Sequence, residues 1–414
     1  MYRGKLIQIR REIDDLYIIR IRKSGSYFLA NKTSAYILKL ADQGVPINRI
    51  PSILKCEFNI SLETGKIYLQ SLINHIKNMQ SFPLNIDLKS PLRASWKLTS
   101  KCNLKCKHCY SSCSPICNNE FSHSEILQII EKLDRAEVFD ISVTGGEIFT
   151  LSQIKNILTE LVSRKFDVSV FSNATLILEN KDWLFKLPIR KYNISLDGLE
   201  NSHDFIRGKG NFQKVWTCIK ELKQNGNFVL VNCVINSINV KELDEIHDLL
   251  FNNNIEYQFT LMLPLGRGNE NIDLLPQSQD YIDGINKLQK KLLANREKGT
   301  LVHAIDKKII EVYADGKIKK VDDNWTCNAG NTKIDINWNG DVYSCPMCEE
   351  SCLGNILNSN LCELWANEQR IKFIKEKKRP AGHFCIPVRD TISRNEVARQ
   401  KMEEFLGCNL KSLE

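Results

Sequence analysis

The sequence lacks any uninterrupted apolar run that approaches ~20 residues, the length needed to cross a bilayer. Its first residues, Met-Tyr-Arg-Gly-Lys, also lack the apolar segment of a secretory signal peptide. On both counts we expect no membrane partner and a cytoplasmic location. In that compartment the fifteen cysteines stay reduced, so they are expected to be ligands or core residues rather than disulfides.

The composition is that of an ordinary globular protein, with 414 residues, of which 43% are hydrophobic and 26% charged. Such a chain is long enough for two or three domains. The net charge of +8 is distributed unevenly, because residues 1–90 contain fourteen Lys or Arg and seven Asp or Glu. This basic excess indicates an acidic partner for the N-terminal region.

Three closely spaced cysteines mark the stretch 101–110. Cys102, Cys106 and Cys109 are separated by three and two residues. Three thiolates on one loop can hold three irons of a [4Fe–4S] cube and leave the fourth iron open to a small molecule. The alternatives are a zinc knuckle completed by His108, or three cysteines that share no metal.

This spacing, with Tyr110 beside the last cysteine, resembles the signature of the radical S-adenosylmethionine (SAM) enzymes. The resemblance implies that SAM chelates the open iron. It also implies one-electron reduction, by a donor such as flavodoxin or ferredoxin, to a 5′-deoxyadenosyl radical that removes a hydrogen atom from the substrate. Cys102, Cys106 and Cys109 would then be the catalytic residues, and the protein would orient the cofactor.

Between residues 94 and 300, strand patterns alternate with amphipathic helices. Repeated βα units predict an α/β fold with a parallel sheet, and six of them suit a partial (β/α)6 TIM-like barrel. In such barrels the chemistry lies at the carboxyl ends of the strands. The expected strands are 95–100, 138–145, 167–173, 191–197, 228–235 and 256–263.

Polar motifs follow these strands, and the same resemblance implies that they contact SAM. Gly145, Gly146 and Glu147 resemble the family's Gly-Gly-Glu motif, in which bare glycines let backbone carbonyls reach the methionine amine. Arg207 is expected to pair with the SAM carboxylate, with a surface salt bridge as the alternative. Arg267 is expected to touch substrate. The implied cofactor contacts are Tyr110, Gly145, Gly146, Glu147, Ser172, Asn173, Ser195, Asp197 and Arg207.

Residues 1–85 form a predicted domain of their own. The β-rich runs 16–22 and 26–30 predict a hairpin, and three helical patterns follow, the last over about 62–76 with Ile67 and Leu72 at helical spacing. The order resembles the PqqD-like winged-helix element of peptide maturases, in which a leader peptide adds a strand at the hairpin edge. The alternatives are a DNA-binding winged helix and a structural cap.

The region 320–414 is expected to form an auxiliary iron–sulfur domain. Alternating apolar residues around an Asn-Gly pair predict a β-hairpin with a type I′ turn, which brings Cys327 and Cys345 together. The spacing Cys-x12-Gly-x4-Cys resembles the opening of the SPASM or twitch domain.

The later part departs from the fuller SPASM pattern, because only Cys385 stands where a cysteine-dense run is expected. Cys113 and Cys117 are expected to be substrate-side or incidental rather than cluster ligands, and a second auxiliary cluster that uses Cys408 is less favoured. Zinc is the alternative metal for the C-terminal cysteines. We expect at least one auxiliary iron–sulfur cluster drawn from Cys327, Cys345, Cys348, Cys352 and Cys385.

The leading hypothesis is a radical SAM maturase of a ribosomally synthesised peptide whose leader binds the N-terminal domain. Thioether crosslinking is the first choice of reaction, followed by carbon–carbon or ether crosslinks. Epimerisation is less favoured because it needs no net oxidation and so no electron sink. The second class is modification of a small molecule such as a tetrapyrrole. The third is a non-enzymatic, zinc-bearing DNA binder.

Overall fold

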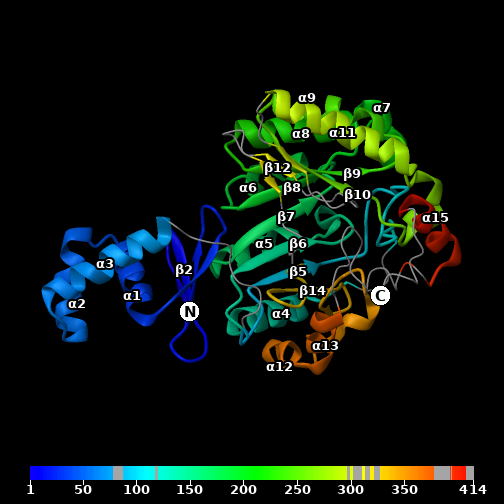
Figure 1. Cartoon of the computed structure of the whole chain (residues 1–414). Helices are drawn as coiled ribbons and strands as arrows, with labels where there is room; N and C mark the ends of the chain where they lie inside the picture. Colours follow the sequence, from blue (N-terminus) through cyan, green and yellow to red (C-terminus); the bar gives the residue numbers. More distant parts are fainter. Residues whose placement is uncertain are drawn as a thin grey trace.

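The computed structural model of the chain describes residues 1–77, 87–116, 120–295, 299–301, 310–312, 318–320, 327–376, 392 and 394–406. A smaller N-terminal part, blue in Figure 1, lies beside a larger α/β part built around one long sheet. Among the described helices, none has the length and apolar character needed to span a bilayer.

Six parallel strands form the centre of the larger part, and they lie side by side in sequence order. Each coincides with one of the six expected strands to within three residues at either end. Along most of these strands apolar residues alternate with polar ones, and the apolar residues, such as Ile141 and Val143, are buried. The strands are β5 (Arg93–Lys97), β6 (Asp140–Thr144), β7 (Asp167–Ser172), β8 (Lys191–Ser195), β9 (Val229–Ile235) and β10 (Glu256–Leu261).

Amphipathic helices connect these strands, and α4 (His123–Arg135) shows why they form. Ser122 and Glu125 make a capping box at its start, and Ile126, Ile130 and Leu133 bury one stripe against the core. The other helices of this part are α5 (Ile154–Ser163), α6 (Lys181–Leu184), α7 (Glu200–Arg207), α8 (Asn211–Gln224), α9 (Leu243–Phe251), α10 (Arg267–Glu270) and α11 (Ser278–Asn295).

The sheet continues past both of its outer parallel strands. β14 (Lys333–Ile336) pairs in parallel with β5 and is followed by antiparallel β15 (Asp341–Tyr343) and β16 (Cys352–Asn355). The cysteine-bearing C-terminal hairpin is therefore built onto the strand that precedes Cys102. Beyond β10 lie β11 (Gly299–Leu301), β12 (Ile310–Val312) and β13 (Ile318–Lys320), and the C-terminal helices are α12 (Leu361–Trp365), α13 (Glu368–Glu376) and α15 (Glu396–Leu406).

The expected β14–β15 hairpin forms, but the prediction of a type I′ turn is wrong. Gly340 N donates to Asn337 O at 2.9 Å, so Trp338 and Asn339 are the central residues of the turn. A type I′ turn needs positive φ at both central residues, whereas positive φ occurs only afterwards, at Gly340 (+88°). Trp338 is thereby held at the tip of the hairpin.

The N-terminal part is a four-stranded antiparallel sheet with three helices, which corrects the expected two-stranded hairpin. β3 (Tyr17–Ile21) and β4 (Tyr27–Ala30) are the predicted pair, and β1 (Tyr2–Arg3) and β2 (Ile7–Arg11) extend it in the order β1-β2-β3-β4. One face packs Ile9, Ile19 and Phe28 into a small apolar core. The helices are α1 (Lys32–Asp42), α2 (Ile50–Phe58) and α3 (Leu62–Lys77), and a short 3₁₀ turn, Ile47–Arg49, lies between α1 and α2.

The opposite face of this sheet is buried against the larger part through charged side chains. Arg20 is fully buried and pairs with both Asp140 and Asp167, and Arg22 also pairs with Asp167. These aspartates open β6 and β7, at the amino ends of the parallel strands. The N-terminal part therefore docks at the end of the sheet opposite to the loop that carries Cys102.

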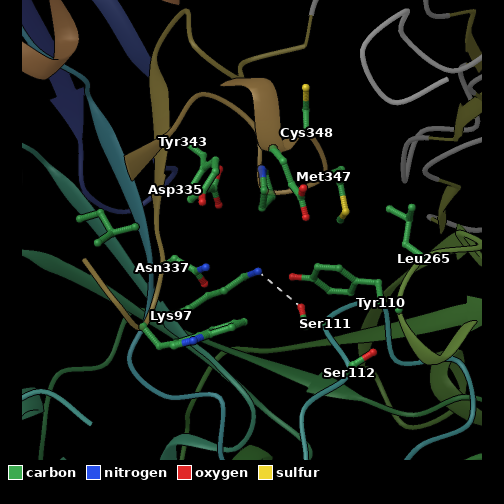
Figure 2. A pocket seen from close by; sticks show the side chains of 15 residues that line it. Lys97, Tyr110, Ser111, Ser112, Leu265, Asp335, Asn337, Tyr343, Met347 and Cys348 are labelled. Atoms are coloured by element: carbon green, nitrogen blue, oxygen red, sulfur yellow. Dashed lines mark hydrogen bonds between the residues drawn. The ribbon is translucent and has the colours of Figure 1, made fainter. Parts of the chain in front are cut away.

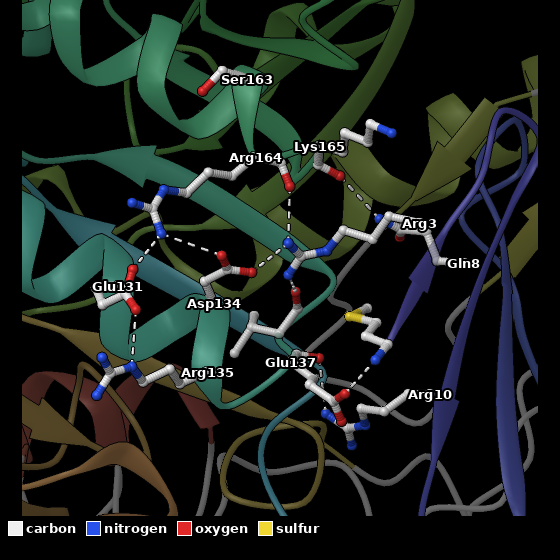
Figure 3. A network of polar contacts seen from close by, with 12 residues as sticks. Arg3, Gln8, Arg10, Glu131, Asp134, Arg135, Glu137, Ser163, Arg164 and Lys165 are labelled. Carbon is white, nitrogen blue, oxygen red and sulfur yellow. Dashed lines mark hydrogen bonds and ion pairs between the residues drawn. The ribbon is translucent and has the colours of Figure 1, made fainter.

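Figure 3 shows the other half of the same interface, around Arg3. Its guanidinium binds the Asp134 carboxylate at 2.5 Å and the Arg164 carbonyl at 2.8 Å. Gln8 donates to the Lys165 carbonyl at 3.1 Å. Part of the basic excess in the N-terminal region thus finds its acidic partner within the chain.

Candidate active site

The loop after β5 presents three thiols at the carboxyl end of the sheet. Cys102 N donates to Ser114 O at 2.8 Å, which closes the loop on itself. The side chains of Cys102 and Cys106 are buried, and Cys109 is half-buried. The predicted trio is therefore gathered on one short closed loop.

N–H groups surround the sulfur atoms of this loop. Leu104 N lies 3.4 Å from Cys102 Sγ, and Asn173 Nδ2 lies 3.8 Å from the same sulfur. Arg207 Nη1 lies 3.8 Å from Cys106 Sγ. Burial raises the pKa of the Cys102 thiol to about 11 although the bond from Leu104 N opposes this, so its thiolate needs a bound metal to be stable. Donors directed at sulfur suit an iron–sulfur cluster, whose potential depends on such bonds.

His108, the residue that would complete a zinc knuckle, is engaged elsewhere. Its Nε2 lies 2.6 Å from Asp197 Oδ2, and both side chains are buried. The alternative of a zinc site with His108 as fourth ligand is therefore not supported.

The Gly145-Gly146-Glu147 segment packs against the start of the cysteine loop. A Cβ on Gly146 would stand 2.1 Å from Lys101 O, so only glycine is accommodated there. Gly146 N donates to Thr99 O at 2.7 Å, and Glu147 N donates to Lys101 O at 2.8 Å. Gly146 is therefore needed so that the backbone can approach the cysteine loop closely.

The Glu147 carboxylate is fully buried and joins two of the expected SAM-contacting segments. It accepts hydrogen bonds from Ser172 Oγ at 2.9 Å and from Asn173 N at 2.8 Å. Ser172 therefore bonds Glu147 rather than projecting alone into a cavity. Burial raises the pKa of Glu147 to about 7, against the opposing effect of these donors.

Asp197 is the centre of a second buried cluster below the loop. It accepts from Arg207 Nε at 2.5 Å and from Val234 N at 2.9 Å, in addition to its contact with His108. Burial acts to raise its pKa, but Arg207 and His108 hold that pKa well below the usual range. Asp197 thus orients Arg207 toward Cys106, while Ser195 lies half-buried at the end of β8.

Arg267 has a role that the sequence did not reveal. Its side chain is buried and donates to Cys106 O at 3.0 Å and to Cys113 O at 2.6 Å, while its backbone N donates to Cys109 O at 2.9 Å. It therefore holds the backbone of the cysteine loop. The sequence predicts only a substrate contact for this arginine. Its contacts with the cysteine loop could not be predicted, because that loop lies far away in the chain and leaves no local pattern around Arg267.

The C-terminal cysteines lie on the hairpin beside β5. Cys345 and Cys348 are buried, whereas Cys327 and Cys352 are half-buried. Ser351 shapes this loop by donating to the carbonyls of Cys345 and Cys348 at 3.1 and 2.6 Å. Three residues with expected or open roles lie outside the described part of the chain: Cys117, Cys385 and Cys408.

A cavity of about 360 Å³ separates the two cysteine loops (Figure 2). Tyr110 lines it, so this predicted cofactor contact faces the C-terminal hairpin. The cavity is bounded by Lys97, Tyr110, Ser111, Ser112, Leu265, Gly266, Asp335, Ile336, Asn337, Trp338, Tyr343, Pro346, Met347, Cys348 and Glu349.

Two families of known proteins match this arrangement. Residues 96–250 match the radical SAM superfamily, and residues 327–386 match SPASM, an iron–sulfur cluster-binding domain. The chain contains a radical SAM domain and a SPASM domain. It is accordingly a radical SAM enzyme that uses SAM, a SAM-binding [4Fe–4S] cluster and auxiliary iron–sulfur chemistry. In the described part of the chain no three ligand side chains converge on a single ion, whereas the thiols of Cys102, Cys106 and Cys109 on one loop, with N–H donors at Cys102 and Cys106, suit the separate irons of the first cluster.

Several characterised radical SAM proteins are similar in sequence. Mycofactocin maturase MftC of Mycolicibacterium smegmatis is 28% identical over 313 residues, which cover 72% of this chain and 77% of the relative. The sporulation killing factor maturation protein SkfB of Bacillus subtilis is 27% identical over 298 residues, covering 71% and 69%. Fe-coproporphyrin III synthase of Methanosarcina barkeri is 28% identical over 296 residues, covering 66% and 73%.

Among solved structures, that of Streptococcus suis SuiB bound to its precursor peptide SuiA has a TM-score of 0.62. The likeness covers 89% of each chain at 18% sequence identity. At this identity the likeness shows the fold alone, an α/β fold with a mostly parallel central sheet.

Proposed function

We propose that this enzyme matures a ribosomally synthesised peptide in the cytoplasm, with flavodoxin or ferredoxin as reductant. The cavity between the two cysteine loops carries the proposal, because Tyr110 and Ser111 line one side and Cys348 the other. A substrate there would lie between the radical source and the auxiliary cluster. When bound, SAM and its cluster supply a 5′-deoxyadenosyl radical for hydrogen abstraction.

The N-terminal part, residues 1–85, is proposed as the leader-recognition element. Among the described strands β4 pairs with β3 alone, so its other edge is available for an added strand. Nearby α3 contributes His75, whose ring lies 6.1 Å from that of Phe28 on β4. Ile67 and Tyr68 of α3 are 59% and 42% exposed. The helical spacing in the sequence predicts one apolar face for Ile67 and Leu72, but only Leu72 is buried. A leader peptide would cover such exposed apolar groups.

Glu147 is the proposed anchor for the SAM ammonium group. Its carboxylate accepts bonds from Ser172 Oγ, Asn173 N and Phe149 N, which leaves one of its four lone pairs for a further donor. A cation placed there would favour the ionised carboxylate and offset the cost of burial. Gly145, Ser195 and Arg207 complete the proposed cofactor cradle in residues 94–300, and the auxiliary ligands are proposed from residues 320–414.

The proposed reaction is a thioether crosslink from a cysteine thiol to a peptide carbon. The carbon would lose one hydrogen atom to the 5′-deoxyadenosyl radical, and the thiol would release its proton to solvent as its sulfur bonds to that carbon. One electron is then left over, which an auxiliary cluster beside Cys348 would accept. Carbon–carbon or ether crosslinks need the same electron sink, whereas epimerisation does not.

The test combines the anaerobically reconstituted enzyme, SAM, a reductant and a precursor peptide encoded next to the enzyme. A loss of two mass units, absent with a Cys102→Ala/Cys106→Ala/Cys109→Ala variant, is expected for a crosslink. An unchanged mass with deuterium uptake from solvent would indicate epimerisation instead. The same peptide without its leader should react far more slowly, and equal rates would refute recognition by the N-terminal part.

Modification of a tetrapyrrole is the second candidate, because Fe-coproporphyrin III synthase is among the relatives. Incubation of the same enzyme with an iron tetrapyrrole precursor of iron coproporphyrin III distinguishes the two. Conversion of that tetrapyrrole with no change in any leader-bearing peptide would replace the peptide proposal.

A further inference from the structure

Lys97 is a buried cation that points into the cavity between the cysteine loops. It is the last residue of β5, and only 8% of its surface is exposed. Figure 2 shows its ammonium group directed at the middle of the cavity, between the Tyr110 ring and the C-terminal hairpin. Its Nζ lies 5.0 Å from the centre of the Tyr110 ring and 5.5 Å from that of Trp338.

This ammonium group has aromatic neighbours but no anionic partner among the described residues. Its one polar contact is with Ser111 Oγ at 3.4 Å, and no described carboxylate lies within 4.0 Å. The nearby Asp335 is balanced by Lys333 at 3.2 Å. Because buried charges in proteins are normally paired, a cation held in this way is prepared for an anion that arrives with a ligand.

The same cavity offers acceptors for a peptide backbone. Asp335 Oδ2 and Asn337 Oδ1 are buried and have no hydrogen-bond partner in the described part of the chain. Both residues line the cavity together with Lys97. The wall therefore combines acceptors for backbone N–H groups with one donor cation for an acidic group.

We propose that Lys97 binds a carboxylate side chain of the substrate and so selects a core peptide with an Asp or Glu residue near the modified position. The inference rests on the proposed function in placing a peptide in the cavity. SAM also has a carboxylate, and the expected SAM contact Tyr110 lines this cavity, but the expected contacts that are polar at the cluster loop, Glu147, Asn173 and Arg207, do not. The geometry therefore assigns Lys97 to the substrate rather than to SAM.

The test measures binding of two small probes to the reconstituted full chain with saturating SAM, by calorimetry. N-acetylglutamate N-methylamide should bind about tenfold more tightly than N-acetylglutamine N-methylamide, because a charge-assisted bond is made only with the first. Lys97→Gln should abolish this preference, and Lys97→Arg should keep part of it. Lys155→Gln, which alters an exposed lysine on α5, is the matched control and should behave like the wild type.

Two outcomes would overturn the proposal. Equal affinities of the wild type for both probes would show that Lys97 does not read a carboxylate. A loss of SAM binding in Lys97→Gln that matches its loss of probe binding would place the SAM carboxylate there instead. Peptide-independent SAM cleavage by each variant reports folding and cluster loading. A wild type that modifies no peptide but discriminates the probes would refute the proposed function and leave the Lys97 site standing.

Discussion

Arg267 supports the cysteine loop from inside the protein. Three of its N–H groups hold carbonyl oxygens of cysteine-loop residues, and Gly266 makes the approach possible, because a Cβ there would stand 2.5 Å from Tyr110 O. None of these contacts involves a cysteine sulfur. The positions of the thiols thus depend on a residue more than a hundred positions later in the chain.

Replacing Arg267 should therefore weaken cluster retention. Arg267→Ala removes two charge-assisted bonds and should destabilise the loop by about 3 kcal/mol, whereas Arg267→Lys, which keeps the charge without the planar fork, should lose less. The measurement is the iron content after anaerobic reconstitution and the rate at which visible absorbance fades with a chelator. An unchanged rate in Arg267→Ala would show that the loop holds its shape without the clamp.

Glu147 should make stability depend on pH. Its folded-state pKa of about 7 exceeds the usual 4.5, so between these pH values the folded chain binds more protons than the unfolded chain. The free energy of unfolding should therefore fall as pH rises through this window, by at most about 3 kcal/mol.

Glu147→Gln, which mimics the protonated acid, should lack this component. Urea unfolding of the metal-free wild type and variant at several pH values between 4 and 8 isolates it, since the other groups titrate alike in both. Parallel stability curves for the two proteins would contradict the expectation.

At the scale of elements, the parallel strands could be predicted from the sequence, whereas only two of the four strands of the N-terminal sheet, β3 and β4, could be. Most parallel strands alternate buried apolar residues, such as Ile141 and Val143, with polar ones, and this pattern is visible without knowing the neighbouring strands. In β2 and β3, by contrast, Gln8, Arg10 and Arg20 occupy alternate positions and yet are fully buried. In the sequence, polar residues at alternate positions predict a face exposed to solvent. The hydrogen-bond partners that allow these three side chains to be buried belong to distant elements of the fold and cannot be seen in the local sequence.

The buried arginine cluster predicts a large difference between two arginines of the same sheet. Arg20→Met leaves Asp140 and Asp167 buried with fewer partners and should cost about 3–5 kcal/mol. Arg11→Met is the matched control, because Arg11 and its partner Asp15 are 64% and 57% exposed, and it should cost less than about 1 kcal/mol. Urea unfolding of the two variants compares them, and equal losses would mean that the interface does not depend on Arg20.

At the scale of the whole molecule, the sequence identified the chemistry and the structure supplied its arrangement. Cys102, Cys106 and Cys109 were predictable because their ligand spacing is local. The pairing of β14 with β5, which brings Cys348 to the same cavity as Tyr110, is not local and has no signature in the sequence. The long-range contacts of Lys97 and Arg267 likewise could not be predicted from the sequence.

That arrangement predicts two iron sites that can be emptied separately. Cys348 lies buried in the C-terminal loop, whereas Cys362 is exposed on α12 and serves as the matched control. A wild type with two [4Fe–4S] clusters should hold roughly eight irons, and Cys348→Ala should lose roughly half, while Cys362→Ala should lose none. SAM cleavage without peptide should persist in both, because Cys102 and its two partners are intact. Full iron content in Cys348→Ala would place the auxiliary cluster on other cysteines. Loss of SAM cleavage in that variant would instead show that the C-terminal hairpin, paired to β5, holds the catalytic loop in shape.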